Sequence, residues 1–139
     1  GMVVAAGSSC KAPDKIPGFS MAVGTEHIRL LCKEVSKIHY IPMDLIKAVS
    51  AEGRWMFVVM SIDLKERKLG ISVDFEKFAD IGYWQLPPDT ELPDGELLYI
   101  GQNAENDKAN RLAGVLDDVC IYKRALDDAD VDRFKKYYS

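Results

Sequence analysis

The sequence lacks any apolar run near the roughly 20 residues that a membrane-spanning helix needs. Its first residues, GMVVAAGSSC, hold an apolar run over 2–6, shorter than the ~7–15 residues of a signal peptide's hydrophobic region. We therefore expect no membrane association and no signal peptide within this chain.

Cysteine and histidine are scarce. Cys10, Cys32 and Cys120 are three in number and show no CxxC spacing, which argues against a zinc site. They are either three buried free thiols, or one disulfide and a remaining thiol. His27 and His39 have no acidic partner pattern around them, so we expect neither to be catalytic.

The charges do not favour one sign strongly. The chain has 22 acidic and 18 basic residues, a formal net charge of −4, and its lysines and arginines are scattered. This balance gives no electrostatic reason to expect binding to nucleic acid or to an anionic membrane. A length of 139 residues suits a single domain with a sizeable core.

Short apolar segments separated by turn residues predict an all-β fold. The polar sequence LKER between two of these segments predicts a hairpin. Two other regions differ: 43–49 is spaced like a short helix, and the proline-rich stretch 82–96 is typical of a long loop. The expected strands are 18–24, 27–33, 54–63, 68–75, 96–101 and 114–122.

The end of the chain carries the signals of a helix start. Asp127 can cap a helix and Asp130 stands three residues later, an aspartate version of the capping box. Leu126 and Val131 occupy the two positions of a hydrophobic staple. We therefore predict a short helix over about 128–137.

Two adjacent aspartates lie inside the last expected strand. Strand alternation places Asp117 on the face of Val115 and Val119, and Asp118 on the opposite face, so one carboxylate points toward an apolar layer. A buried carboxylate needs a partner, and Arg124 just beyond the strand is the nearest. We predict an Asp117–Arg124 salt bridge; a metal ligand or a catalytic acid are the alternatives for Asp117.

The same region resembles the closing signature of laminin-G-like jelly-roll domains, in the concanavalin A-like lectin/glucanase superfamily. IGQN is followed by a polar loop and then by GVLDDVCIYKRALDDADVDRFKKYY, and upstream GRWMFVVMSID resembles the family's Gly-x-Trp strand. The family's Asp-Gly turn is Asp74-Phe75 here. The matched positions are Gly114, Leu116, Asp117, Asp118, Ile121, Tyr122, Arg124, Ala125, Leu126 and Asp130.

The resemblance covers most of 17–139 and implies a two-sheet antiparallel jelly-roll sandwich with a short C-terminal helix. The chain is then one such domain, 1–139, apparently lacking the family's opening strands. Many relatives hold a structural calcium with acids from that opening and from the Asp-Asp strand, and only Asp117 and Asp118 carry over. An open sheet edge is also implied, filled in part by 2–6 or covered by a second copy in a homodimer.

Catalytic patterns of the superfamily are missing. Retaining hydrolysis needs two closely spaced carboxylates, and no Glu-x-Asp-x-x-Glu occurs. We therefore expect that the protein is not an enzyme. The strand 54–63 is apolar on both faces, with Trp55 as a structural residue, so its surplus face is either covered by a loop or helix or forms the floor of a groove.

A carbohydrate site is best sought in the expected loop 82–96. Tyr83 and Trp84 either stack on a sugar ring or pack under their own loop, and Asp80, Gln85 and Asp89 could bind its hydroxyls. We expect a non-catalytic carbohydrate-binding or adhesion module of an exported bacterial protein, located outside the cell, at its surface or in the periplasm. The alternatives are a protein–protein interaction or structural module without glycan affinity, and a degenerate glycoside hydrolase-like domain.

Overall fold

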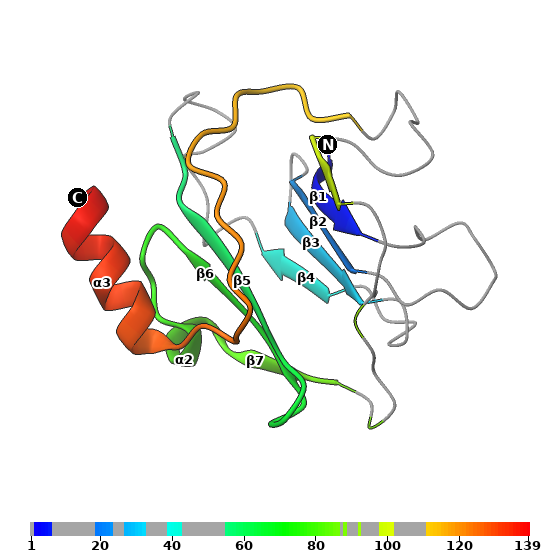
Figure 1. Ribbon diagram of the computed structural model, residues 1–139, viewed down its shortest axis with the longest axis vertical. Helices are drawn as coiled ribbons and strands as arrows, with labels where there is room; N and C mark the ends of the chain where they lie inside the picture. Colours follow the sequence, from blue (N-terminus) through cyan, green and yellow to red (C-terminus); the bar gives the residue numbers. More distant parts are fainter. Residues whose placement is uncertain are drawn as a thin grey trace, which may run out of the picture. The chain divides into compact units, whose positions relative to one another are not determined.

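The computed structural model (Figure 1) describes residues 2–6, 19–23, 27–32, 39–42, 55–86, 88, 92, 98–101 and 111–139. The chain forms two compact units. One comprises Gly1–Met43 with Pro87–Val119, and the other Asp44–Leu86 with Cys120–Ser139. Neither of the helix-forming segments described is long and apolar enough to cross a membrane.

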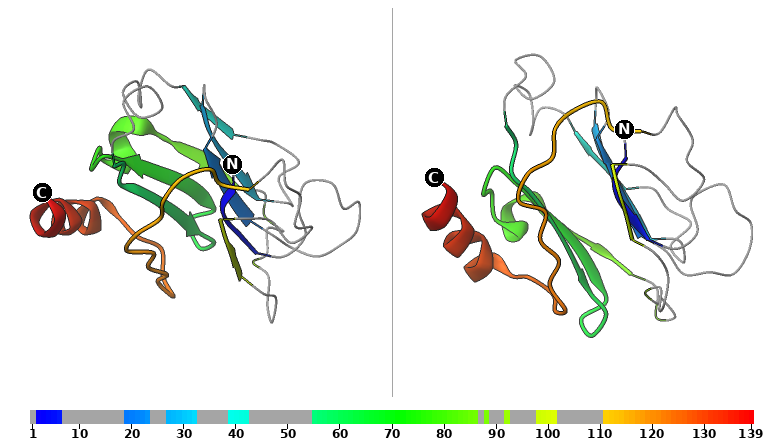
Figure 2. Two further views of the ribbon diagram at one scale, coloured as in Figure 1. Left: turned by 90° about the horizontal axis from the view of Figure 1, so that it is seen from above. Right: turned by 45° about the horizontal axis from the view of Figure 1, so that its top comes forward.

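The first unit contains a five-stranded antiparallel sheet in the order β4-β3-β2-β1-β8 (Figure 2). The expected strands 18–24, 27–33 and 96–101 are confirmed, and β1 shows that 2–6 do form a strand, between β2 and β8. The sequence did not predict β4. The strands are β1 (Met2–Ala6), β2 (Phe19–Val23), β3 (His27–Cys32), β4 (His39–Pro42) and β8 (Leu98–Ile100).

The described residues of the second unit form a three-stranded antiparallel sheet, β5-β6-β7, and two helices. The expected hairpin is confirmed, with Asp63 opposite Lys68 at the turn. The C-terminal helix is confirmed as well, whereas β7 and α2 were not predicted. The elements are β5 (Val58–Asp63), β6 (Lys68–Val73), α2 (Phe78–Ile81), β7 (Tyr83–Gln85) and α3 (Asp128–Tyr138).

One face of this sheet is covered by the two helices. The register places Val59 opposite Ser72 on this face, and Val59 forms a buried cluster with Phe78 of α2 and Val131 of α3. The surplus apolar face of β5 is thus covered rather than open as a groove. The covered face does not extend to Trp55, whose side chain is 65% exposed. Partly buried residues around the cluster are Phe57, Phe75, Leu126 and Phe134.

The turn after β6 has left-handed backbone at two ordinary residues, Asp74 (φ 48°) and Phe75 (φ 66°). Such angles are unfavourable for a bulky side chain. Hydrogen bonds from Asp74 N to Phe57 O (2.8 Å), from Phe57 N to Asp74 Oδ1 (3.1 Å) and from Glu76 N to Val73 O (3.0 Å) hold the turn. The Phe75 ring also stacks on Phe57, with centroids 4.6 Å apart. These contacts offset the backbone strain.

Two expectations are wrong in this part of the chain. Residues 114–122, all of which the structure describes, form no strand, and their apolar side chains are exposed. The expected loop 82–96 begins instead with β7. The expected helix 43–49 and Asp89 lie outside the described residues.

Candidate functional site

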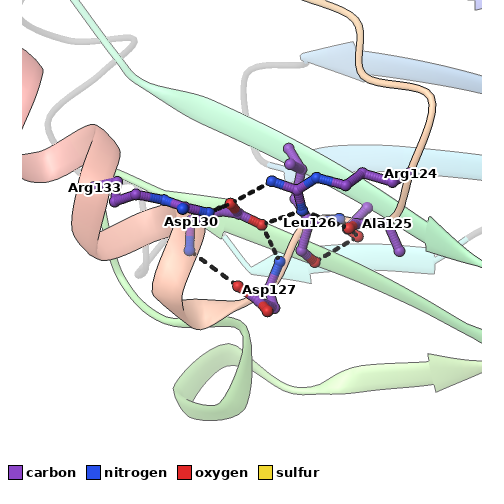
Figure 3. A network of polar contacts seen from close by, with 7 residues as sticks. Arg124, Ala125, Leu126, Asp127, Asp130 and Arg133 are labelled. Carbon is purple, nitrogen blue, oxygen red and sulfur yellow. Dashed lines mark hydrogen bonds and ion pairs between the residues drawn. The ribbon is translucent and has the colours of Figure 1, made fainter.

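A group of polar side chains and backbone groups surrounds Asp130 at the start of α3 (Figure 3). The Asp130 side chain is only 2% exposed. Arg124 binds it with two parallel hydrogen bonds, from Nη1 to Oδ2 and from Nη2 to Oδ1, each 2.7 Å long. Arg133 also donates to Oδ1, and the Asp127 backbone N–H donates to Oδ2 (2.9 Å). Four donors therefore converge on one buried carboxylate.

The predicted Asp117–Arg124 salt bridge is wrong, because the bidentate partner of Arg124 is Asp130. Asp117 is exposed, and its Oδ1 accepts a hydrogen bond from the backbone N–H of Asp118 (2.9 Å). The prediction assumed a buried strand at 114–122. Without that strand, neither aspartate has to be buried.

The predicted helix cap is confirmed. Asp127 Oδ1 accepts from the Asp130 N–H at 3.0 Å, and the Asp130 side chain accepts from the Asp127 N–H, which completes a capping box. The hydrogen bond from Arg124 lowers the pKa of Asp130 well below its usual range; burial opposes this, and the bonds from Asp127 and Arg133 add to it. Leu126 packs against the cluster that contains Val131, as the staple predicted. This group of residues fixes the start of α3.

Three further contacts fasten α3 and its leading residues to the rest of the second unit. The Ser61 hydroxyl of β5 donates to Leu126 O (2.8 Å) and accepts from Leu126 N (2.9 Å). Asp128 Oδ1 accepts a hydrogen bond from Phe78 N at 2.7 Å. Lys77, just before α2, forms an ion pair with Asp132 of α3 at 3.2 Å. The Asp130 group is thus part of the contacts that hold the start of α3 against β5 and α2.

The geometry of the described residues gives little support for a metal site or for thiol chemistry. Within the described ranges no group of three or more His, Cys, Asp or Glu could hold a metal ion. Calcium at Asp117 and Asp118 stays a prediction. Cys120 is an exposed free thiol, so the expectation that it is buried is wrong. Cys32 belongs to β3, and Cys10 lies outside the described residues.

A second candidate site lies on the helix-covered face of the sheet, beyond the part that the helices cover. Its centre is Tyr83 of β7, which is 40% exposed and pairs with Gly70 of β6. A Cβ atom at Gly70 would lie 2.9 Å from Tyr83 Cε1 and 2.9 Å from Phe78 Cδ1. The glycine therefore lets the tyrosine ring lie against the strand. The Phe78 ring stacks beside it, with centroids 6.0 Å apart and an interplanar angle of 25°.

The structure brings together only part of the predicted carbohydrate site. Tyr83 and Gln85 share one face of β7, but alternation places Trp84 on the other face, so the two aromatic rings form no common platform. Asp80, the third predicted hydroxyl ligand, is an exposed residue of α2, which is a helix of four residues.

Two residues of this face were missed by sequence reasoning. Lys68 pairs with Gln85 and Asp63 pairs with Lys68, so all three share the face of Tyr83. The Lys68 ammonium lies over the Tyr83 ring, with Nζ 4.4 Å from the centroid. Extending the hairpin register by one strand would have indicated both residues.

Burial and three carboxylates act on the Tyr83 hydroxyl. Partial burial raises the pKa of Tyr83 above its ordinary value, and the carboxylates of Asp128, Asp127 and Asp63 raise it further. The site thus combines an accessible ring, one ammonium, one amide and several carboxylates.

No family model matches this chain, and neither does any curated protein or any solved structure.

Proposed function

We propose that this protein is a non-catalytic carbohydrate-binding module of an exported bacterial protein, acting outside the cell, at its surface or in the periplasm. The proposal includes a laminin-G-like, two-sheet jelly-roll sandwich over 1–139. The sequence resemblance over 124–138 supports it, whereas the strand that the resemblance implies over 114–122 is not formed. The observation that carries the function is the accessible Tyr83 ring lying on Gly70, beside Gln85.

Sugar rings present apolar C–H faces, and aromatic rings bury such faces with little loss of side-chain freedom. At Tyr83 the ring is held by Phe78 and by the strand beneath it, so little ordering accompanies binding. Gln85 and Asp63 share the face of Tyr83, and in this proposal they bind the sugar hydroxyls. One platform with few polar groups predicts weak binding, with a Kd of roughly 0.1–1 mM, or about −5 kcal/mol.

Titration with plant and host-type oligosaccharides, followed by NMR, tests the proposal. The Tyr83 ring and Gln85 amide signals should move with a common Kd, and Tyr83→Ala should abolish the response. Tyr137→Ala is the matched control, because Tyr137 is an 81% exposed tyrosine of α3 and its removal should leave binding unchanged. Static Tyr83 signals across the panel would refute the proposal.

A protein–protein interaction module is the second candidate, and a different observation favours it. Val115 is 75% and Ile121 63% exposed, and they belong to a run of exposed apolar side chains between 115 and 122. Such concentrations of apolar surface mark interaction sites. The proposed partner is a second copy of the chain, in a homodimer. Light scattering should then show a dimer that Val115→Ser and Ile121→Ser convert to a monomer; a wild-type monomer at high concentration would refute it.

A further inference from the structure

The Tyr83 ring already holds a cation. The Lys68 ammonium lies 4.4 Å from the ring centroid, within the roughly 6 Å over which a cation is attracted to an aromatic face. The β6–β7 register fixes the two residues on one face, with Gly70 paired to Tyr83 and Lys68 to Gln85. The ring face that a ligand would use is therefore one on which a positive charge fits.

Three carboxylates act electrostatically on the Tyr83 side chain. Asp63 shares its face through the β5–β6 register. Asp128 is bound to the backbone of Phe78, whose ring stacks on Tyr83, and Asp127 precedes it in the chain. The effect on the tyrosine agrees with this placement, since the three carboxylates add to burial in raising the pKa of Tyr83. Lys68 is the ammonium on the ring, and Asp63, Asp127 and Asp128 are the carboxylates whose charge reaches the Tyr83 hydroxyl.

We propose that the Tyr83 site binds sugars that carry a free amino group, with the sugar ammonium taking the place that the Lys68 ammonium now occupies on the ring. The inference rests on the proposed carbohydrate-binding function and specifies its ligand class. The sugar's apolar face stacks on Tyr83, its ammonium is attracted by the ring and by Asp63, Asp127 and Asp128, and Gln85 binds a hydroxyl.

The same charges discriminate among sugars of equal size. An acidic sugar brings a carboxylate toward three others, and such like-charge contacts are the usual means of rejecting a wrong ligand. An N-acetylated sugar keeps the stacking but lacks the ammonium, so it binds more weakly than the free amine. Lys68 is a tethered competitor, and its side chain must leave the ring before any sugar can stack there.

The test uses three oligosaccharide series of the same length, composed of glucosamine, N-acetylglucosamine or a hexuronic acid. The intact chain is titrated at about pH 5.5, where the sugar amines are protonated. The Kd values from the Tyr83 ring signals should increase in that order. Raising the salt concentration should weaken glucosamine binding most, because charge contributes most there.

Variants of Lys68 identify the site of competition. Lys68→Met and Lys68→Gln should each strengthen glucosamine binding about 2–5-fold, the range expected when an exposed cation–π contact is removed from competition. Lys65→Met is the matched control, since Lys65 is an exposed lysine of the hairpin turn and should not affect binding. Using two Lys68 variants, each checked for a native-like NMR spectrum, separates competition from a folding defect.

The outcomes separate the two proposals. If N-acetylated or acidic sugars move the Tyr83 signals as strongly as glucosamine does, or if the Lys68 variants bind no better, the amino-sugar inference fails while carbohydrate binding stands. If no series moves the Tyr83 signals in any variant, both fail.

Discussion

Two acidic regions near the end of the chain have similar sequences and different environments. Asp130 is 2% exposed and receives hydrogen bonds from two arginines and a backbone N–H. Asp117 is exposed, and the bond to its Oδ1 comes from the neighbouring backbone N–H of Asp118. A carboxylate is buried where several donors converge, because each bond replaces part of its lost hydration. Asp117 and Asp130 are 13 positions apart in the chain. Their comparison shows that the converging donors, rather than the acidic pair itself, decide whether a carboxylate is buried.

The apolar residues of the two regions differ in the same way. Leu126 and Val131 pack into the cluster around Val59, whereas Val115 and Ile121 are 75% and 63% exposed. Ser61 binds the backbone of Leu126 and so holds that residue against β5. Similar apolar spacing thus leads to burial only where the backbone is also fixed.

The largest expected effect comes from removing Arg124. Arg124→Ala leaves the buried Asp130 carboxylate with less compensation, which should lower the free energy of unfolding more than any of the other changes below. Urea denaturation measures the change.

Asp117→Ala is the matched control and should stay within about 0.5 kcal/mol of the wild type. Combined with Arg124→Ala it should be additive, whereas Arg124→Ala with Asp130→Ala should cost less than the sum of the two. Coupling between Asp117 and Arg124 would restore the salt bridge that the structure contradicts.

Protonation of Asp130 in acid should lower the free energy of unfolding by less than Arg124→Ala does, because protonation leaves every side chain in place. The pKa of Asp130 is lowered in the folded state, so its stabilising contribution is complete above the ordinary carboxyl pKa of about 3.9 and is lost progressively as the pH falls below it. Thermal unfolding followed from pH 7 down to about pH 2 measures this loss. Asp130→Asn should flatten the acid limb of the profile; a profile identical to that of the wild type would show that Asp130 has an ordinary pKa.

The smallest expected difference in stability is between alanine substitutions at two glycines, Gly70 and Gly114. Gly70→Ala should lower the free energy of unfolding by about 1 kcal/mol, the low end for overpacking, because its Cβ would lie 2.9 Å from both Phe78 and Tyr83 and the exposed tyrosine can shift. Gly114→Ala meets its nearest atom, Leu112 Cγ, at 3.8 Å and should be neutral or slightly stabilising. Comparable losses at both positions in chemical denaturation would mean that the close contact at Gly70 does not matter.

The elements specified by local chemistry could be predicted. The alternation of β6 and the LKER turn indicated the hairpin, and Asp127 with Asp130 indicated the start of α3. In both cases residues close in sequence determine the structure, through strand periodicity or through bonds across one helical turn.

Elements that depend on distant partners could not be predicted in this way. The residues 114–122 alternate as a strand does, but alternation does not reveal whether a partner strand is present. Arg124 was matched to the acid before it, although the capping acid of the next helix lay six residues after it. At the carbohydrate site, Tyr83 and Gln85 were foreseen, while Lys68 and Asp63 followed only from the pairing of β6 with β7 and β5.

The hydrogen bonds between Ser61 and Leu126 also affect the order of folding. They join residues 65 positions apart, and closing a loop of that length costs about 3.7 kcal/mol of chain entropy beyond a constant term. The β5–β6 hairpin closes a far shorter loop and can form within about 1–10 µs, before the contacts with α3. During synthesis the hairpin must therefore wait, with the Val59 face uncovered, until the ribosome has released the chain through Val131. In that interval this face is the surface of the second unit that a chaperone would bind.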